Sequence, residues 1–189
     1  AQTALYHISR AMVRWIAPIL SFTAEEMWEF IPGEKLESVH LSQWYQDLPV
    51  LADNALLGYG YWQTIMKVKS AVNKVLETKR KEGLIGATLE AQVTLYCSGE
   101  LQQQLQQLGD ELRFAMITSS AEVKPMDSSI AALSTDIDGL EITVTKSEHK
   151  KCDRCWHYRE DVGVNSEHSE LCARCVDNVE GKGEQRQFA

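Results

Sequence analysis

The sequence lacks the features of a membrane-bound or secreted protein. No apolar run approaches the roughly 20 residues that a membrane-spanning helix needs. The N-terminus begins Ala1-Gln2-Thr3 and has no basic stretch followed by an apolar one, so no secretory signal is visible. It also begins without a methionine, and we therefore expect a fragment or a processed product. These absences predict a cytoplasmic protein that does not bind a membrane.

The motifs of common nucleotide-binding and hydrolytic enzymes are missing as well. The chain contains no G-x-x-x-x-G-K-[ST], no G-x-G-x-x-G and no G-x-S-x-G. The segment Met66-Lys67-Val68-Lys69-Ser70 is superficially similar to a nucleotide-binding lysine loop, but it lies inside an expected amphipathic helix. We therefore predict no catalytic residue in this chain.

Cysteine is scarce, yet four of the five cysteines form two matched pairs. Cys152 and Cys155 make one C-x2-C pair, Cys172 and Cys175 make the other, and sixteen residues separate the two pairs. Four such thiolates suit a tetrahedral Zn²⁺ at about 2.3 Å from each sulfur. Because four protein ligands leave no position for water, we predict one structural zinc ion. The missing secretory signal favours a metal over disulfides and a reducing compartment.

Positive charge is also scarce, and it is concentrated in one stretch. The net charge is -8, whereas residues 67–82 carry six basic and two acidic side chains. At 100° per residue, Lys67, Lys74 and Lys81 fall within about 40° of one another on a helix, opposite an apolar face. This lysine stripe can bind successive phosphates of a nucleic acid. The alternative is a solvated helix face without a partner.

An aromatic and two arginines accompany the cysteine pairs. Trp156 follows Cys155 directly, and Arg154 and Arg174 lie inside the two pairs. Trp156 can stack on an unpaired base, or it can pack over the metal site as a miniature core. Both interpretations remain open at this point. The candidate contacts to a nucleic acid are Lys67, Lys74, Lys81, Arg154, Trp156 and Arg174.

The hydrophobic periodicity changes along the chain. Apolar residues recur at three- to four-residue steps from Leu5 to Ile19. A long helix is expected from about Asp53 or Asn54 to Glu82, interrupted or bent near Gly58 and Gly60. Strand-like alternation begins after Leu89. The elements expected there are a strand over 92–96, a helix over 100–114 and short strands over 121–124 and 140–145. We predict an α+β protein in three parts: an antiparallel helical bundle over 1–86, a small β-α-β-β module over 87–146 and a four-cysteine zinc ribbon over 147–189.

Four segments of the chain carry a resemblance to a known family. They are Ile16-Ala17-Pro18-Ile19-Leu20-Ser21-Phe22-Thr23-Ala24-Glu25-Glu26-Met27-Trp28, residues 72–77, residues 85–91, and the zinc module with its ending Gly183-Glu184-Gln185-Arg186-Gln187-Phe188. Over essentially the whole chain, they resemble the bacterial isoleucyl-tRNA synthetases, which are class I aminoacyl-tRNA synthetases. The bundle signals are shared with the valine and leucine enzymes, whereas the zinc module points to isoleucine.

The resemblance implies a role at the C-terminal, anticodon-binding end of such an enzyme. The full enzyme would join isoleucine to tRNA-Ile with ATP and Mg²⁺ and would edit mischarged valine. The H-I-G-H and K-M-S-K-S loops of its catalytic core are absent here. The resemblance implies a bundle of the class I anticodon-binding type that grips the anticodon end of tRNA-Ile. The expected partners are tRNA-Ile and the missing catalytic and editing domains, and we expect a monomer.

Two other functions are compatible with paired cysteines. A DNA glycosylase of the formamidopyrimidine type has nearly the same spacing, but it predicts a base-contacting arginine in a glycine-flanked hairpin between the pairs. Residues 162–168 are acidic and lack arginine. The second alternative is a non-catalytic zinc ribbon that binds another protein, with the acidic β-α-β-β module as its contact surface.

Overall fold

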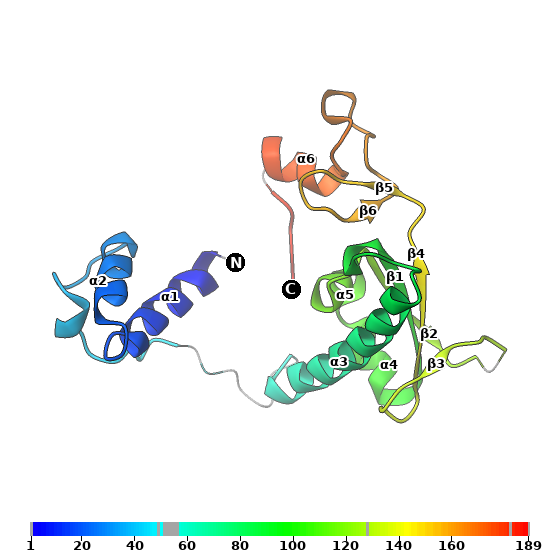
Figure 1. Cartoon of the computed structure of the whole chain (residues 1–189), viewed down its shortest axis with the longest axis horizontal. Helices are drawn as coiled ribbons and strands as arrows, with labels where there is room; N and C mark the ends of the chain where they lie inside the picture. Colours follow the sequence, from blue (N-terminus) through cyan, green and yellow to red (C-terminus); the bar gives the residue numbers. More distant parts are fainter. Residues whose placement is uncertain (1, 49, 51–56, 128, 182, 189) are drawn as a thin grey trace. The chain divides into compact units, whose positions relative to one another are not determined.

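The structure, a computed structural model, describes residues 2–48, 50, 57–127, 129–181 and 183–188 (Figure 1). It divides into two compact units, residues 1–55 and 56–189, which we describe separately. Within the described ranges, no helix combines the length and apolar character that crossing a membrane requires. The expected helix start at Asp53 or Asn54 lies outside the described residues.

The first unit is built from two helices and a short helical turn. Helix α1 (Gln2–Ile16) ends just before Pro18, α2 (Ser21–Phe30) follows, and η1 (Val39–Leu41) closes the unit. Their common core is small, and Trp28 is its largest buried side chain, with its indole Nε1 donating to the Leu36 carbonyl at 2.8 Å. The core residues are Val13, Ala17, Ala24, Trp28, Ile31 and Val39.

The second unit contains a four-stranded sheet with the order β2-β1-β4-β3. Its strands are β1 (Ala91–Cys97), β2 (Ser120–Pro125), β3 (Leu133–Ser134) and β4 (Leu140–Lys146). β1 pairs in parallel with β2 and antiparallel with β4. A parallel pair needs a crossover connection, and helices α4 (Gly99–Gln106) and α5 (Leu112–Met116) supply it. The predicted strands over 92–96, 121–124 and 140–145 are therefore confirmed.

The predicted single helix over 100–114 is wrong. It is interrupted after Gln106, and a short turn, η3 (Gly109–Glu111), precedes α5. Gly109 has a φ of 51°, a left-handed conformation that a continuous α-helix excludes. The interruption places Asp110 and Glu111 at the surface end of the crossover, where both make contacts to the C-terminal part of the chain.

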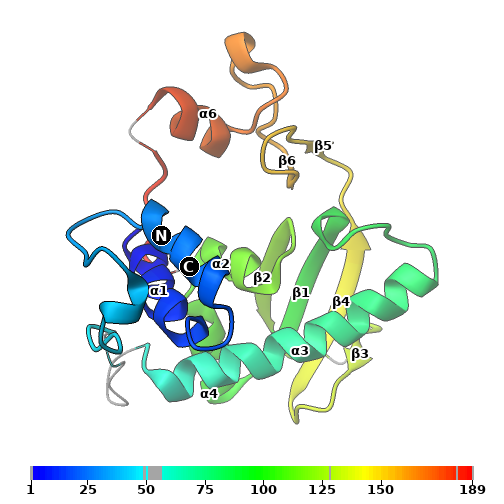
Figure 2. The same ribbon diagram turned by 60° about the vertical axis from the view of Figure 1, so that its left-hand side comes forward.

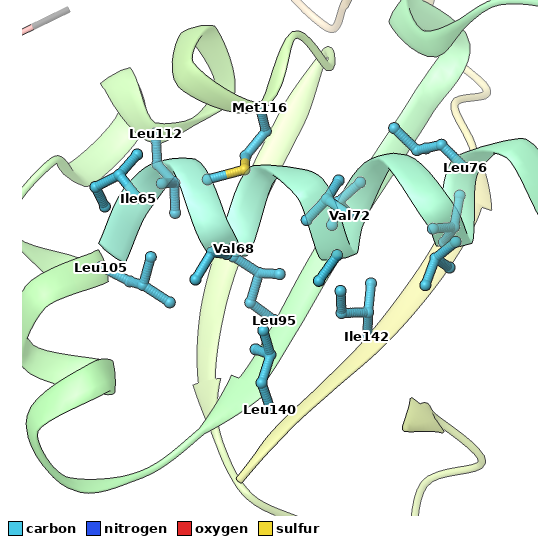
Figure 3. Packing of buried hydrophobic residues seen from close by; sticks show 14 of the residues in the cluster. Ile65, Val68, Val72, Leu76, Leu95, Leu105, Leu112, Met116, Leu140 and Ile142 are labelled. Atoms are coloured by element: carbon cyan, nitrogen blue, oxygen red, sulfur yellow. The ribbon is translucent and has the colours of Figure 1, made fainter. Parts of the chain in front are cut away.

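The long helix α3 (Tyr59–Lys81) lies along one face of the sheet (Figure 2). Its buried side chains meet those of the strands and of α4 and α5 in one hydrophobic core (Figure 3). Ile65, Val68 and Val72 of α3 contribute to the same core as Leu95 of β1 and Ile142 of β4. The helix assigned by its sequence to a bundle over 1–86 thus shares a core with the module over 87–146. The three-part division itself stays a prediction.

The last part of the second unit is a small module around the cysteines. It consists of strands β5 (Lys150–Lys151) and β6 (Tyr158–Arg159), a turn η4 (Ser166–His168) and helix α6 (Ala173–Glu180). The backbone N–H of Tyr158 donates to Ser119 Oγ at 2.7 Å, which joins the module to the start of β2. The chain then returns from α6 toward α5 (Figure 1). There the Glu111 carboxylate accepts the backbone N–H groups of Gln187 and Phe188 at 2.7 and 2.8 Å.

Candidate metal centre and nucleic-acid contacts

Backbone hydrogen bonds turn each cysteine pair into a tight loop. In the first pair, the N–H of Cys152 donates to the His157 carbonyl at 2.9 Å, and the N–H of Trp156 donates to the Cys152 carbonyl at 2.8 Å. In the second pair, Cys172 is the residue that precedes the first turn of α6, and the N–H of Cys175 donates to the Cys172 carbonyl at 2.9 Å. Each pair therefore directs two thiols to the same side of its loop.

The four predicted ligands come together in one cluster. The sulfurs of Cys152, Cys155, Cys172 and Cys175 all lie within 4.8 Å of one another, and those of Cys155 and Cys172 are 3.7 Å apart. Sulfurs arranged tetrahedrally at about 2.3 Å from a zinc ion are separated by about 3.8 Å. Three of the four cysteines are buried, and none forms a disulfide. This cluster, which we call the sulfur cage, fits a four-coordinate zinc ion in spacing and in ligand chemistry.

The surroundings of the sulfurs favour ionisation at one position and oppose it at another. Burial raises the pKa of Cys155, but hydrogen bonds from His157 and Arg174 outweigh it and lower that pKa to about 5. Burial raises the pKa of Cys172 to about 12, and it also raises the pKa of Cys175. A coordinating metal deprotonates a thiol outright. These surroundings favour the thiolate form of Cys155, and a metal would supply the drive to ionise Cys172 and Cys175.

Both arginines of the cysteine pairs face the sulfur cage. Arg154 Nη1 donates to Cys175 Sγ at 3.7 Å, and hydrogen bonding to Cys155 raises the pKa of Arg174 despite its burial. Arg174 also binds both carboxylate oxygens of Glu184, at 3.1 and 3.3 Å. Four thiolates around Zn²⁺ carry two excess negative charges, which two guanidinium groups can offset. Part of their donor capacity is thus used within the module, and their contact with a nucleic acid stays a prediction.

Trp156 does not pack over the sulfur cage. Its side chain is 59% exposed, and the apolar residues that contact the cysteines are instead Val162 and Leu171. Its backbone has a φ of 64°, the left-handed conformation, which costs a bulky residue on the order of 1–2 kcal/mol. The ammonium group of Lys151 lies 4.9 Å from the centroid of the indole ring. The exposed ring is therefore not a buried core for its module, and its stacking on a base stays a prediction.

The lysine stripe lies on the solvent side of α3, opposite the sheet. Lys67, Lys74 and Lys81 are all exposed, as the helical pattern predicted. Lys74 forms an ion pair with Asp136, which precedes β4, and this contact lowers the pKa of the aspartate. Such an exposed pair contributes little to stability, so Lys74 can exchange Asp136 for another anion at small cost.

The first unit holds a basic aromatic cluster that sequence reasoning missed. Arg14 lies 4.7 Å from the ring centroid of Trp28 and 5.2 Å from that of Tyr45, and Arg10 lies 5.3 Å from that of Tyr6. The cluster borders a cavity of about 590 Å³, and beside it Trp44 is 67% exposed. The signal for this cluster was the four-residue spacing of the two arginines on one helix face.

Comparison with known proteins gives two family matches. Residues 1–95 match the anticodon-binding domain of tRNA ligases, and residues 150–178 match a zinc finger found in FPG and IleRS. The second match covers all four cysteines of the sulfur cage.

Curated relatives match the chain over all of its 189 residues. Isoleucine–tRNA ligases from Saccharophagus degradans, Pseudomonas putida strain W619 and Pseudomonas aeruginosa strain UCBPP-PA14 are 55%, 54% and 52% identical to it. The match covers 20% of each relative, so the chain spans about a fifth of their length. These relatives confirm the resemblance and do not favour the DNA glycosylase alternative. With its helical half and its sulfur cage both accounted for, the chain belongs to the family of anticodon-binding domains of tRNA ligases.

Proposed function

We propose that the chain is the anticodon-binding part of an isoleucine–tRNA ligase. In full, this enzyme would join isoleucine to tRNA-Ile with ATP and Mg²⁺ and would hydrolyse mischarged valine in a separate domain. The proposal is supported by the names of the relatives and by the two family matches. The chain contributes binding rather than chemistry, because no motif of the catalytic core occurs in it.

The observation that carries the proposal is Trp156 held exposed beside the sulfur cage. A zinc ion in the cage would fix the loop structurally, and the chain's own residues would make the contacts. An exposed indole on a constrained backbone can stack on an unpaired base with little loss of conformational freedom. Lys151, next to the ring, can bind the phosphate that adjoins such a base. Anticodon loops offer unpaired bases of this kind.

The lysine stripe and the two cage arginines are proposed as further contacts. Lys67, Lys74 and Lys81 are spaced by about 10 Å per seven residues along α3, so they can bind phosphates along one strand. Arg154 and Arg174 would act chiefly through the cage that they stabilise. We further propose a monomeric protein of the cytoplasm whose partners are tRNA-Ile and the catalytic and editing domains.

A binding comparison tests this function. The chain, loaded with zinc, is titrated with tRNA-Ile, with other tRNAs and with nicked duplex DNA at the same salt concentration. We expect the tightest binding to tRNA-Ile, because the zinc module distinguishes the isoleucine enzymes from their relatives. Equal affinity for every tRNA would contradict the isoleucine assignment, and a preference for nicked duplex DNA would contradict the function as a whole.

A further inference from the structure

A buried arginine on α5 has a donor group without a partner. Arg113 is only 6% exposed, and its guanidinium Nη1 forms an ion pair with Asp110 at 2.8 Å. Neither its Nε nor its Nη1 has a well-aligned hydrogen-bond acceptor among the residues that the structure describes, so the contact with Asp110 is an ion pair without a hydrogen bond. Buried charged donors are normally satisfied, because leaving one unpaired costs free energy. The unpaired Nε therefore marks a place where an acceptor is missing.

A second guanidinium lies beside the first and is also poorly satisfied. Arg159 of β6 approaches the other oxygen of Asp110 at 3.8 Å and Asp161 at 3.9 Å, both too long for hydrogen bonds. Burial, followed by the positive charge of Arg159, lowers the pKa of Arg113. Its ordinary pKa is so high that it stays charged at neutral pH. Asp110 thus stands between two cations and binds only one of them closely.

The two arginines border open space. A cavity of about 510 Å³ is lined by Asp110, Arg113, Phe114 and Arg159, and a second cavity of about 590 Å³ shares Asp110 and Arg159 with it. The Asp110 side chain is 69% exposed on the short turn η3, so it can leave without uncovering the core. The neighbouring cations Arg174 and Arg186 both pair with Glu184. A ligand that displaced Asp110 would therefore meet Arg113 and Arg159, whose charges Glu184 does not neutralise.

We propose that Arg113 and Arg159 form a phosphate-binding site in which the Asp110 carboxylate holds the place of the phosphate. A phosphate group offers more acceptor oxygens than a carboxylate, so it can satisfy the Arg113 Nε and bring Arg159 into hydrogen-bond range. Asp110 and Asp161 already neutralise Arg113 and Arg159. A phosphate therefore binds by displacing Asp110. The source is an RNA backbone phosphate, in which case the site rests on the proposed function, or a free phosphate.

If this site binds phosphate, two substitutions should change its phosphate affinity in opposite directions. Inorganic phosphate is titrated into the zinc-loaded chain, and the side-chain Nε–H resonances of the arginines are followed by NMR at constant ionic strength. We expect a saturable shift at Arg113. Asp110→Asn removes the competing charge and should tighten phosphate binding about tenfold, whereas Arg159→Gln should weaken it by a similar factor.

Matched controls separate the site from a general charge effect. Asp138→Asn and Lys146→Gln change exposed charges that do not line either cavity, and they should leave the phosphate affinity unchanged. The proposal is overturned by the absence of a saturable shift at Arg113, by an equal shift with chloride, or by unchanged affinity in Asp110→Asn.

Binding of tRNA-Ile to Arg159→Gln decides the source of the phosphate. A weaker complex with a salt slope lowered by about 0.7–0.9 supports an RNA phosphate. An unchanged complex excludes RNA as the source. If the unaltered chain binds no tRNA, the proposed function fails, while the titration with inorganic phosphate still decides the site.

Discussion

At the scale of single residues, Trp156 combines an unfavourable backbone conformation with an exposed ring. A residue that served only to complete the turn would be glycine, which adopts a positive φ without steric cost. The indole instead stays in solvent beside Lys151. Strain that is retained without a packing benefit points to a requirement outside the module. In the proposed function, the ring is kept exposed so that it can stack on an unpaired base of the tRNA.

Substitutions at Trp156 should separate folding from binding. Trp156→Gly relieves the backbone strain but removes the ring, so we expect the free energy of unfolding to change by no more than about 1 kcal/mol. Affinity for tRNA-Ile should fall by about 1–3 kcal/mol, the contribution of one stacked base. Thermal unfolding and tRNA titration measure the two effects.

Trp156→Phe is the matched control, because it keeps an aromatic face and should retain much of the tRNA affinity. Val164→Ala, which alters another exposed apolar side chain of the same module, should have no effect on tRNA binding. Equal losses in all three variants would argue that the ring has no specific contact.

At the scale of elements, α3 presents a lysine stripe on one face and a hydrophobic core on the other. Lys74→Ala should lower tRNA affinity and reduce the slope of its salt dependence by about 0.7–0.9, because one fewer counterion is released. Titrations at several salt concentrations give the slope. Asp136→Asn is the control, since it frees Lys74 and should not weaken binding. An unchanged slope in Lys74→Ala would mean that the stripe is only a solvated face.

The buried face of α3 makes a separate prediction about cooperativity. Ile65→Ala removes a side chain that is 1% exposed, and it should destabilise the sheet by about 2–5 kcal/mol. Because α3 and the strands share one core, the amide protons of β1 and β4 should exchange faster together with those of α3. If the amide protons of β1 and β4 exchanged as slowly as before, the segments before and after residue 86 would fold independently.

Long periodic elements could be predicted from the sequence, whereas short interruptions could not. α3, β1 and β4 each bury one face, so their apolar residues repeat with a clear period. The break between α4 and α5 was hidden because Leu101, Leu105, Leu108 and Leu112 keep a helical spacing across it. The core partner of α3 was also hidden, because an apolar face does not specify what covers it.

At the site, the sequence predicts which residues come together but not where their side chains point. The C-x2-C spacing was enough to predict the sulfur cage, since two such loops place four thiolates together. The inward orientation of Arg154 and Arg174 was not predicted, because it depends on the negative charge that the assembled cage creates. Arg113 gave no signal at all, since an arginine in an amphipathic helix is usually solvated.

At the scale of the whole molecule, stability is divided between a large core and a metal-dependent module. The module has few buried apolar residues besides its cysteines. A structural zinc ion typically supplies about 10–16 kcal/mol of apparent binding free energy, more than about forty residues supply from their own core. Cys172→Ser should therefore unfold residues 150–188 and leave α1 and α2 folded. Zinc analysis and amide exchange measure the outcome.

Cys97→Ala is the control for that experiment, because Cys97 is buried in β1 and lies outside the sulfur cage. It should retain zinc. A native pattern of amide protection over residues 150–188 after zinc removal would contradict the metal-dependent role of the cage.

The return of the chain from α6 to α5 has a consequence for substitutions near its end. Glu111 binds Gln187 and Phe188 through their backbone N–H groups and so is indifferent to which side chains these residues carry. Most replacements at position 187 should therefore be silent, with proline as the exception because it has no N–H to donate. At position 188 the side chain matters as well, since Phe188 packs against the main core. Position 187 should thus accept any residue with a backbone N–H, whereas position 188 also needs a side chain that fits the core.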